Sequence, residues 1–303
     1  MKNVSVSAIL YALAAALFYA LNVPCSKLLL GYISPTMMAA FLYLGAGLGV
    51  GGMYLFRLPK EQKAERLNKN DLPYTIGMVL LDIIAPILLM IGVNIGSSSN
   101  ATLLGNFEIA ATTVIALLIF RERVSRLLWI AIAFITLSSI ILTFGGAGSF
   151  DFSLGSVFVL GATVCWGFEN NCTRKISGKS THQIVTIKGL CSGAGSLIIA
   201  LTVGESFPQI RYIALALLLG FVAYGLSIFT YIRAQKTLGA AKTSAYYAVA
   251  PFIGAFLSFV LLGERLTTAY LAALAVMIAG TAFAVYDTLS PASTGTTTDD
   301  TEG

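Results

Sequence analysis

The sequence contains few charged residues. Only 11% of its 303 residues are Asp, Glu, Lys or Arg, and 57% are hydrophobic, whereas a soluble domain has a charged share of about 25%. With 19 basic and 14 acidic side chains, a chain of this length cannot cover a water-exposed surface. This scarcity excludes a soluble enzyme, a nucleic-acid binder and a disordered chain, and it predicts an integral membrane protein.

Residues that build metal and catalytic sites are also scarce. The chain has one histidine, His182, and four cysteines that all fall within apolar stretches, where cysteine is ordinarily a small packing residue. No Cys and His cluster has the spacing of a zinc or haem site. Nucleotide-binding motifs and nucleophile–base pairs are also missing. We therefore expect no metal, no cofactor and no enzymatic activity, and a primary pump is disfavoured.

Long apolar runs follow one another along most of the chain. A helix needs about 20 mostly apolar residues to cross a bilayer core, and these runs lack the two-residue alternation of a barrel strand. The sequence therefore predicts an all-α membrane protein with ten transmembrane helices. The predicted spans are residues 5–28, 34–55, 72–93, 98–119, 125–146, 153–174, 182–203, 210–231, 240–262 and 266–287. The polar segment 288–303 is expected to be a disordered tail.

Lysine and arginine are unevenly distributed over the two sides of this topology. With the N-terminus in the cytoplasm, 15 of the 19 basic residues fall on the inner side, and only Lys27, Arg211 and Arg265 fall on the outer side. This bias is the positive-inside pattern of membrane proteins. We expect a multi-pass protein of the cytoplasmic membrane with both termini, and hence the tail, in the cytoplasm.

The two halves of the chain resemble each other at two places. The segment FYALNVPCSKLL, from Phe18, aligns with CWGFENNCTRKI, from Cys165, at an offset of 147 residues. The segment FRERV at 120–124 aligns with LGERL at 262–266 at an offset of 142 residues. Two matches in the same order indicate an internal repeat. Because each half has five spans, the second enters the membrane in the opposite direction, as in secondary transporters. The expected repeats are residues 5–146 and 153–287.

These features resemble those of the EamA family, within the drug/metabolite transporter superfamily. The resemblance rests on the two five-span halves, on an aromatic–small–x–polar pattern before a basic residue in the first and sixth spans, and on Glu-Arg closing the fourth and ninth. It implies a small-metabolite carrier, often an exporter, with a central cavity lined by spans 1, 3, 4, 6, 8 and 9. The first half departs from the family pattern at Ile109, where proline is common, and at Arg121, where a small residue is usual. Their counterparts Pro251 and Gly263 follow it.

Glu169 and Lys188 are two of four ionisable residues well inside the predicted spans. A charge there costs roughly 2.5–3.5 kcal/mol on insertion scales, so it normally faces the protein interior or a wet cavity. At about 1.5 Å per residue, both side chains lie roughly 7–9 Å from the cytoplasmic side, on consecutive antiparallel spans. We expect them to form a pair. The pair is either a structural ion pair, or a gate or anchor for an anionic or zwitterionic substrate.

Asp82 and Glu108 lie near the middle of their spans. A carboxyl group away from water favours its neutral form, so both are candidates for proton coupling. A substrate contact and a structural hydrogen bond are the other interpretations. Nearby polar and aromatic residues fit a cavity wall, or else interhelical hydrogen bonds and interface anchors. The predicted substrate-site residues are Tyr19, Asn22, Asp82, Asn106, Glu108, Trp166, Glu169, Asn170, Lys188, Tyr224, Tyr246 and Tyr247.

Proline and glycine inside the spans predict local features. Pro24 and Pro251 each remove a backbone donor, which kinks a helix and leaves carbonyl groups facing a cavity. The glycine runs at 45–49 and 189–193 follow no strand, so they indicate close helix packing rather than a nucleotide-binding loop.

Together these observations predict a secondary carrier that works by alternating access. Its cargo is expected to be a small metabolite, such as an amino acid or related compound, with export favoured over uptake. A passive channel or facilitator is the alternative, although no ring of like charges or repeated carbonyl loop is visible. The expected partners are the substrate and the lipid bilayer, with no nucleic acid, and a homodimer is left open.

Overall fold

A computed structural model of the chain describes residues 6–57, 66–120, 125–144, 153–238, 243, 246–265 and 267–289. Most of the FRERV motif at 120–124 and nearly all of the predicted tail at 288–303 lie outside the described residues. The last described helix extends to Leu289.

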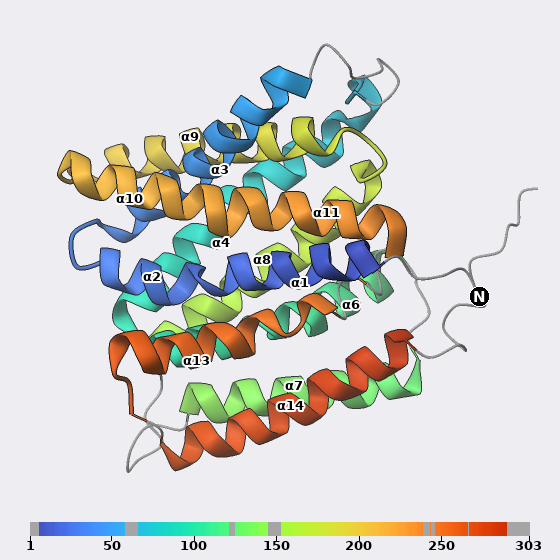
Figure 1. The fold of residues 1–303 in the computed structure, drawn as a ribbon. Helices are drawn as coiled ribbons and strands as arrows, with labels where there is room; N and C mark the ends of the chain where they lie inside the picture. Colours follow the sequence, from blue (N-terminus) through green and yellow to red (C-terminus); the bar gives the residue numbers. More distant parts are fainter. Residues whose placement is uncertain are drawn as a thin grey trace, which may run out of the picture.

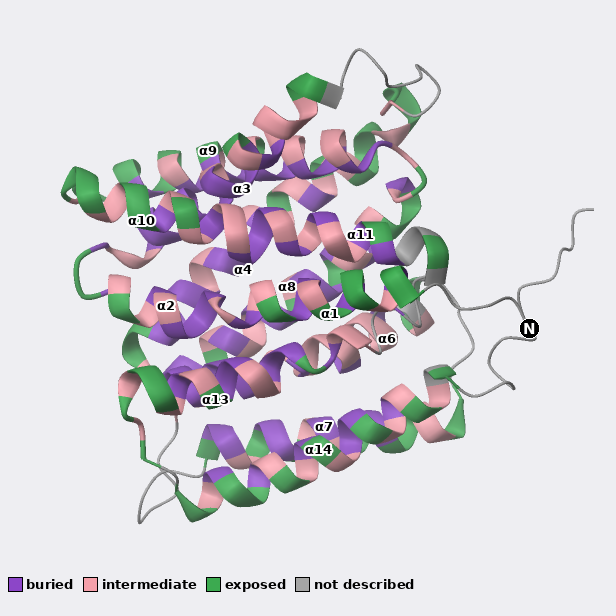
Figure 2. Cartoon of the chain, viewed as in Figure 1, coloured by how far each residue is buried: buried purple, intermediate pink, exposed green. Residues whose placement is uncertain are grey.

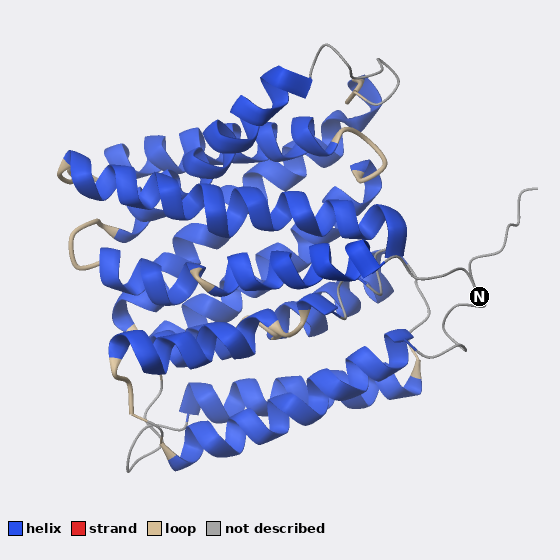
Figure 3. Ribbon diagram, in the orientation of Figure 1, coloured by secondary structure: helices blue, strands red, loops and turns tan. Residues whose placement is uncertain are grey.

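The described residues form a bundle of helices and contain no strand (Figure 1, Figure 3). The longer elements are α1 Val6–Ala20, α3 Pro35–Arg57, α4 Leu72–Ile95, α6 Phe107–Phe120, α7 Arg126–Phe144, α8 Leu154–Ile176, α9 Thr181–Thr202, α10 Ile210–Gly220, α11 Ser227–Leu238, α13 Ala250–Leu262 and α14 Thr268–Leu289. Shorter elements are α2 Asn22–Leu29, the 3-10 turn η3 Lys69–Asp71, α5 Ser98–Leu104 and the π-helical turn η4 Phe221–Leu226.

Eight helical segments in the described part of the chain are long and apolar enough to cross a membrane. They are Val6–Leu29, Pro35–Phe56, Lys69–Ile95, Ser98–Ile119, Arg126–Phe144, Thr181–Thr202, Ile210–Ala234 and Thr268–Asp287. Each overlaps one of the ten predicted spans. The other two predicted spans are not among these eight. One contains α8, whose polar run Glu169-Asn170-Asn171 lowers its hydropathy, and the other contains α13, which is apolar but shorter. The protein is therefore an all-helical, multi-pass membrane protein with eight candidate spans.

The outer surface of the bundle is apolar. Large side chains such as Leu118, Val260 and Phe256 are exposed. Figure 2 shows buried residues gathered in the middle of the bundle, with exposed ones alternating along outer helices such as α14. A surface of this kind suits lipid rather than water. At one edge of the bundle α7 and α14 lie side by side (Figure 1), joined by a 2.7 Å hydrogen bond from Ser138 Oγ to the Ala273 carbonyl oxygen.

The first span is interrupted near its middle. Helix α1 ends at Ala20 and α2 begins at Asn22. Pro24 explains this position, because it has no N–H to donate to the carbonyl of Ala20 four residues earlier. The helix distortion predicted from Pro24 is therefore confirmed.

Two further spans are interrupted at corresponding depths. Helix α13 begins at Ala250 after a turn at 248–249, with Pro251 in its first turn, as its proline predicts. Helix α5 ends one residue before Gly105, and α6 begins at Phe107. This second break was not expected, because Ile109 replaces proline in that span. Gly105 has poor helix propensity and marks the break instead.

Helix α3 packs against α9 on one side and against α10 and η4 on the other, and it does so at glycines. A Cβ atom on Gly189 would lie 2.3 Å from the Gly47 nitrogen, and one on Gly45 would lie 2.1 Å from the Leu217 carbonyl oxygen. The backbones approach so closely that no side chain fits between them. Close helix packing at both glycine runs is therefore confirmed.

We predict that Gly189→Ala destabilises the protein, because the added methyl group meets the backbone of α3 rather than a side chain that can move. Overpacking of this kind typically costs about 1–3 kcal/mol, so the midpoint of thermal unfolding in detergent should fall by several degrees. Gly52→Ala is the matched control, since a Cβ atom there has no neighbour within 4 Å. Equal unfolding midpoints for the two variants would contradict this account of the α3–α9 contact.

Candidate functional site

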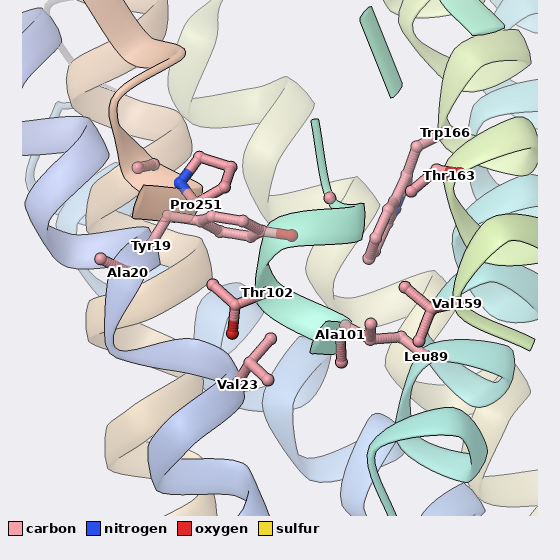
Figure 4. Close-up of a pocket in the computed structure, with 12 residues that line it drawn as sticks. Tyr19, Ala20, Val23, Leu89, Ala101, Thr102, Val159, Thr163, Trp166 and Pro251 are labelled. Atoms are coloured by element: carbon pink, nitrogen blue, oxygen red, sulfur yellow. The ribbon is translucent and has the colours of Figure 1, made fainter. Parts of the chain in front are cut away.

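A small cavity lies where the interrupted helices meet. Its volume is about 20 Å³, which is room for roughly one water molecule. Its walls are formed by Tyr19, Ala20, Val23, Leu89, Ala101, Thr102, Gly105, Val159, Thr163, Trp166, Ala250 and Pro251. These residues belong to the first, third, fourth, sixth and ninth predicted spans. Figure 4 shows the rings of Tyr19 and Trp166 on opposite sides of the cavity.

Three more tyrosines gather beside Tyr19, and we call these four residues the tyrosine cluster. The ring centroid of Tyr19 lies 5.9 Å from that of Tyr224 and 5.8 Å from that of Tyr247. The Tyr43 and Tyr224 centroids are 4.9 Å apart. Tyr224 lies in the π-helical turn η4, a distortion often found at functional sites, and its hydroxyl oxygen accepts a 2.9 Å hydrogen bond from Asn22 Nδ2. The cluster therefore extends the aromatic wall of the cavity.

Lys188 of α9 is paired with two carboxylates, and the three residues form what we call the ion cluster. Its Nζ lies 2.9 Å from Glu169 Oε1 on α8 and 3.0 Å from Asp82 Oδ2 on α4. The predicted Glu169–Lys188 pair is confirmed, whereas Asp82 as a second partner was not expected. Asp82 is 0% exposed and Lys188 7%. These contacts join three helices, and removing one member of such a buried group would leave an uncompensated charge.

Two hydroxyl groups complete the ion cluster. Tyr43 donates a 2.8 Å hydrogen bond to Asp82 Oδ1, and Thr173 donates one to Glu169. Tyr43 thus links the ion cluster to the tyrosine cluster through a single side chain. It was not among the predicted site residues, because in sequence it is one tyrosine among the glycines and apolar residues of α3 and nothing there indicates its partner.

Glu108 lies apart from the ion cluster and is paired with an amide. Asn170 Nδ2 donates a 2.6 Å hydrogen bond to Glu108 Oε1 and lies 3.3 Å from Thr112 Oγ1. Glu108 is half-buried in the first turn of α6, where the helix dipole favours a carboxylate. Within the described residues no lysine or arginine forms an ion pair with it.

Asn106 and Tyr246 complete the predicted set. Asn106 is buried in the break between α5 and α6, and its Nδ2 has no hydrogen-bond partner among the described groups. Tyr246 is half-buried just before α13, and the described residues show no ring contact between it and the tyrosine cluster. The described histidine, cysteine and acidic residues include no group of three that could hold a metal ion.

The corner between α4 and α5 carries a further polar arrangement that was not predicted. Lys27 Nζ donates hydrogen bonds to the carbonyl oxygens of Val93, Asn94 and Gly96 at 2.6, 2.9 and 2.8 Å. These carbonyls lie at the end of α4, where a cation is favoured by the helix dipole.

Glu264 holds the other side of the same corner. Its carboxylate accepts hydrogen bonds from the backbone nitrogens of Ser98 and Ser99 at 2.7 and 2.9 Å and from Ser97 Oγ at 2.9 Å. An acid is favoured at a helix start for the same electrostatic reason. The Glu of the LGERL segment therefore anchors the start of α5. The serine run at 97–99 is the sequence signal that could have indicated a helix start of this kind.

Known proteins resemble this chain over most of its length. A protein of Methanothermobacter thermautotrophicus named "Uncharacterized transporter" is 24% identical over 279 residues, covering 83% of this chain and 78% of that protein. "Uncharacterized transporter YyaM" of Bacillus subtilis is 22% identical over 269 residues, covering 86% of this chain and 87% of that protein. A solved structure titled "Crystal structure of protein" has the same fold, with a TM-score of 0.69 at 17% identity over 93% of this chain and 97% of that one.

The sequence model of the EamA-like transporter family matches the chain twice, over residues 6–144 and 153–286. The two matches cover all the interrupted helices, both clusters and the cavity. They also agree with the apolar, multi-pass bundle described above. The chain belongs to the EamA-like transporter family.

Proposed function

We propose that this membrane transporter is a secondary carrier that moves a small metabolite by alternating access. The observation that carries the proposal is the cavity at the point where three spans are interrupted. Its volume is only about 20 Å³. Interrupted helices around a central site are typical of secondary transporters. A space for about one water molecule is too small for a metabolite. The helices around it must therefore move apart to admit a substrate.

The proposed architecture is ten spans in two inverted repeats, residues 5–146 and 153–287. Two separate matches to one family model support the repeat. The positions of two helix breaks also support the repeat. The break in the fourth span begins at Gly105 and the break in the ninth begins at Ala248, and the distance between them along the chain nearly equals the offset between the two Glu-Arg motifs. With five spans in each half, the second half has the opposite orientation. The proposed topology places both termini and the tail at 288–303 in the cytoplasm and the bundle in the cytoplasmic membrane, as the basic residues indicate.

The proposed substrate is an amino acid or a related small compound. Aromatic side chains and a few polar groups around a cavity suit a ligand with an apolar body and a polar end. Export is preferred to uptake, following the resemblance described above. A homodimer remains compatible with this proposal.

We predict trans-stimulated exchange by the purified protein in liposomes. A carrier reorients faster when it is loaded on both sides, so a metabolite inside the vesicles should accelerate entry of its labelled form, with saturation at high concentration. A panel of amino acids and related metabolites measured by counterflow checks this. Empty liposomes are the control. Entry that grows linearly with concentration and does not respond to internal substrate would instead indicate a passive facilitator.

We also propose proton coupling through Asp82 or Glu108. The two carboxyl groups have different partners, since Asp82 is paired with Lys188 and Glu108 with the amide of Asn170. A buried acid that gains and loses a proton during the cycle would make transport depend on pH.

We expect either Asp82→Asn or Glu108→Gln to retain exchange at saturating substrate concentration but lose its dependence on pH, because an amide cannot take up the proton. Exchange is measured at equal pH on both sides of the membrane over a series of values on either side of neutral pH. The wild-type protein provides the reference profile. If the exchange that remains in both variants follows that profile, neither residue couples protons.

For the ion cluster we propose a role as a gate or as an anchor for a charged substrate group. Lys188→Met should lower stability, because two buried carboxylates lose their cation, a change that costs about 3–5 kcal/mol for a buried pair. Glu169→Gln combined with Lys188→Met should recover part of that loss while exchange stays at least about tenfold below wild type, equivalent to about 1.4 kcal/mol. Thermal unfolding and counterflow on the same samples check both effects. Wild-type exchange by the folded double variant would show that the cluster is only structural.

A further inference from the structure

We propose that the cavity selects substrates that carry an organic ammonium group, and that this group is bound between Glu108 and the tyrosine cluster. The inference rests on the proposed carrier function and specifies the charge of its substrate. The carboxylate would hold the ammonium group, and the rings of Tyr19 and Trp166 would enclose the body of the ligand.

The first argument is the charge balance of the bundle interior. Among the described residues, the buried charged side chains are Asp82, Glu169 and Lys188, and Glu108 is half-buried. The two buried carboxylates, Glu169 and Asp82, are already paired with Lys188, at 2.9 and 3.0 Å. Within the part of the chain that the structure describes, Glu108 forms no ion pair, and its partner is the amide of Asn170, at 2.6 Å. A carboxylate in an apolar interior is costly without a cation, so a cationic ligand would supply the missing partner.

The second argument is the position of Glu108 relative to the cavity. Gly105 forms part of the cavity wall. The carbonyl oxygen of Gly105 accepts a 3.1 Å hydrogen bond from the backbone nitrogen of Glu108. Glu108 therefore belongs to the turn that closes one side of the cavity.

The third argument is the aromatic surroundings. A cation is attracted to the faces of Tyr and Trp rings, and this is how proteins commonly recognise ammonium ligands. Tyr19 and Trp166 lie on opposite sides of the cavity (Figure 4), and Tyr224 and Tyr247 lie within 6 Å of Tyr19 by ring centroid. These rings come from α1, α8, η4 and the turn before α13. A carboxylate beside such rings favours an ammonium group over a neutral group of the same shape.

The break that positions Glu108 also holds an unsatisfied polar group. Asn106 is 2% exposed, and its side-chain nitrogen has no partner among the described residues. A ligand with a hydroxyl or carbonyl oxygen near its ammonium group would satisfy this amide as well. An anionic ligand would be disfavoured next to Glu108, because two like charges repel each other.

The test compares three probes that share a phenyl ring and a short chain but differ in charge, namely 2-phenylethylammonium, 2-phenylethanol and 3-phenylpropanoate. Binding to the purified protein in an amine-free buffer is followed by the fluorescence of Trp166 and by thermal unfolding. The chain has two tryptophans, so Trp129→Phe on the exposed face of α7 leaves Trp166 as the single reporter. We expect the ammonium probe to bind at least about tenfold more tightly than the other two, as for gain of one charge-assisted hydrogen bond.

Variants of Glu108 assign the effect to one carboxylate. Glu108→Gln should weaken binding of the ammonium probe by at least about tenfold and leave binding of the alcohol unchanged. Glu108→Asp keeps the charge and should retain a measurable preference for the ammonium probe. Asp287→Asn is the matched control, because Asp287 lies near the end of α14 and, among the described residues, accepts a hydrogen bond from Ser125. The unfolding midpoint of each variant without probe shows whether it is folded.

Two results would overturn the inference. Equal or tighter binding of the alcohol or the carboxylate by the wild-type protein would show that the cavity does not select for an ammonium group. Unchanged ammonium binding by folded Glu108→Gln would show that another group provides the selectivity. Both results are independent of the carrier proposal, which fails only if counterflow is absent for the whole metabolite panel.

Discussion

In the apolar interior of a membrane, a backbone N–H or C=O without a partner costs several kcal/mol. This constraint explains why the described spans are helical and why their interruptions are confined to one region. The breaks beside Ala20, Gly105 and Ala250 all border the same cavity, where neighbouring helices and polar side chains surround the freed backbone groups. A helix interruption facing lipid would have no such protection. The location of the cavity therefore follows from where the chain can tolerate broken helices.

Two kinds of contact hold the helices around that cavity. Helix α3 meets α9 and α10 at glycines, where backbones touch and little adjustment is possible. Helices α4, α8 and α9 are joined instead by the ion cluster, whose strength depends on charge and on the exclusion of water. The glycine contacts make one part of the bundle stiff. The ion cluster does not depend on close backbone contact, so it is better suited to the part that would change in the proposed transport cycle.

Much of the fold follows from the sequence, because helix length, apolar composition and proline act over a few neighbouring residues. The break at Pro24 and the pairing of Glu169 with Lys188 could be predicted in this way, the latter because their spans are consecutive. The contact of Tyr43 with Asp82 and the anchoring of α5 by Glu264 could not. Both join residues from elements whose adjacency is set by tertiary packing. The break at Gly105 was missed because a glycine in a helix is often tolerated and gives a weaker signal than proline.

The corner between α4 and α5 has a consequence for the speed of the protein. Lys27 and Glu264 come from distant parts of the chain and hold opposite sides of the same short connection, each through three hydrogen bonds. Moving either anchor away breaks several charge-assisted bonds together, because all of them end on neighbouring backbone or hydroxyl groups. In the proposed transport cycle, opening of this end of the bundle would be a cooperative step. The lifetime of the closed corner would then set an upper limit on the number of transport cycles per second.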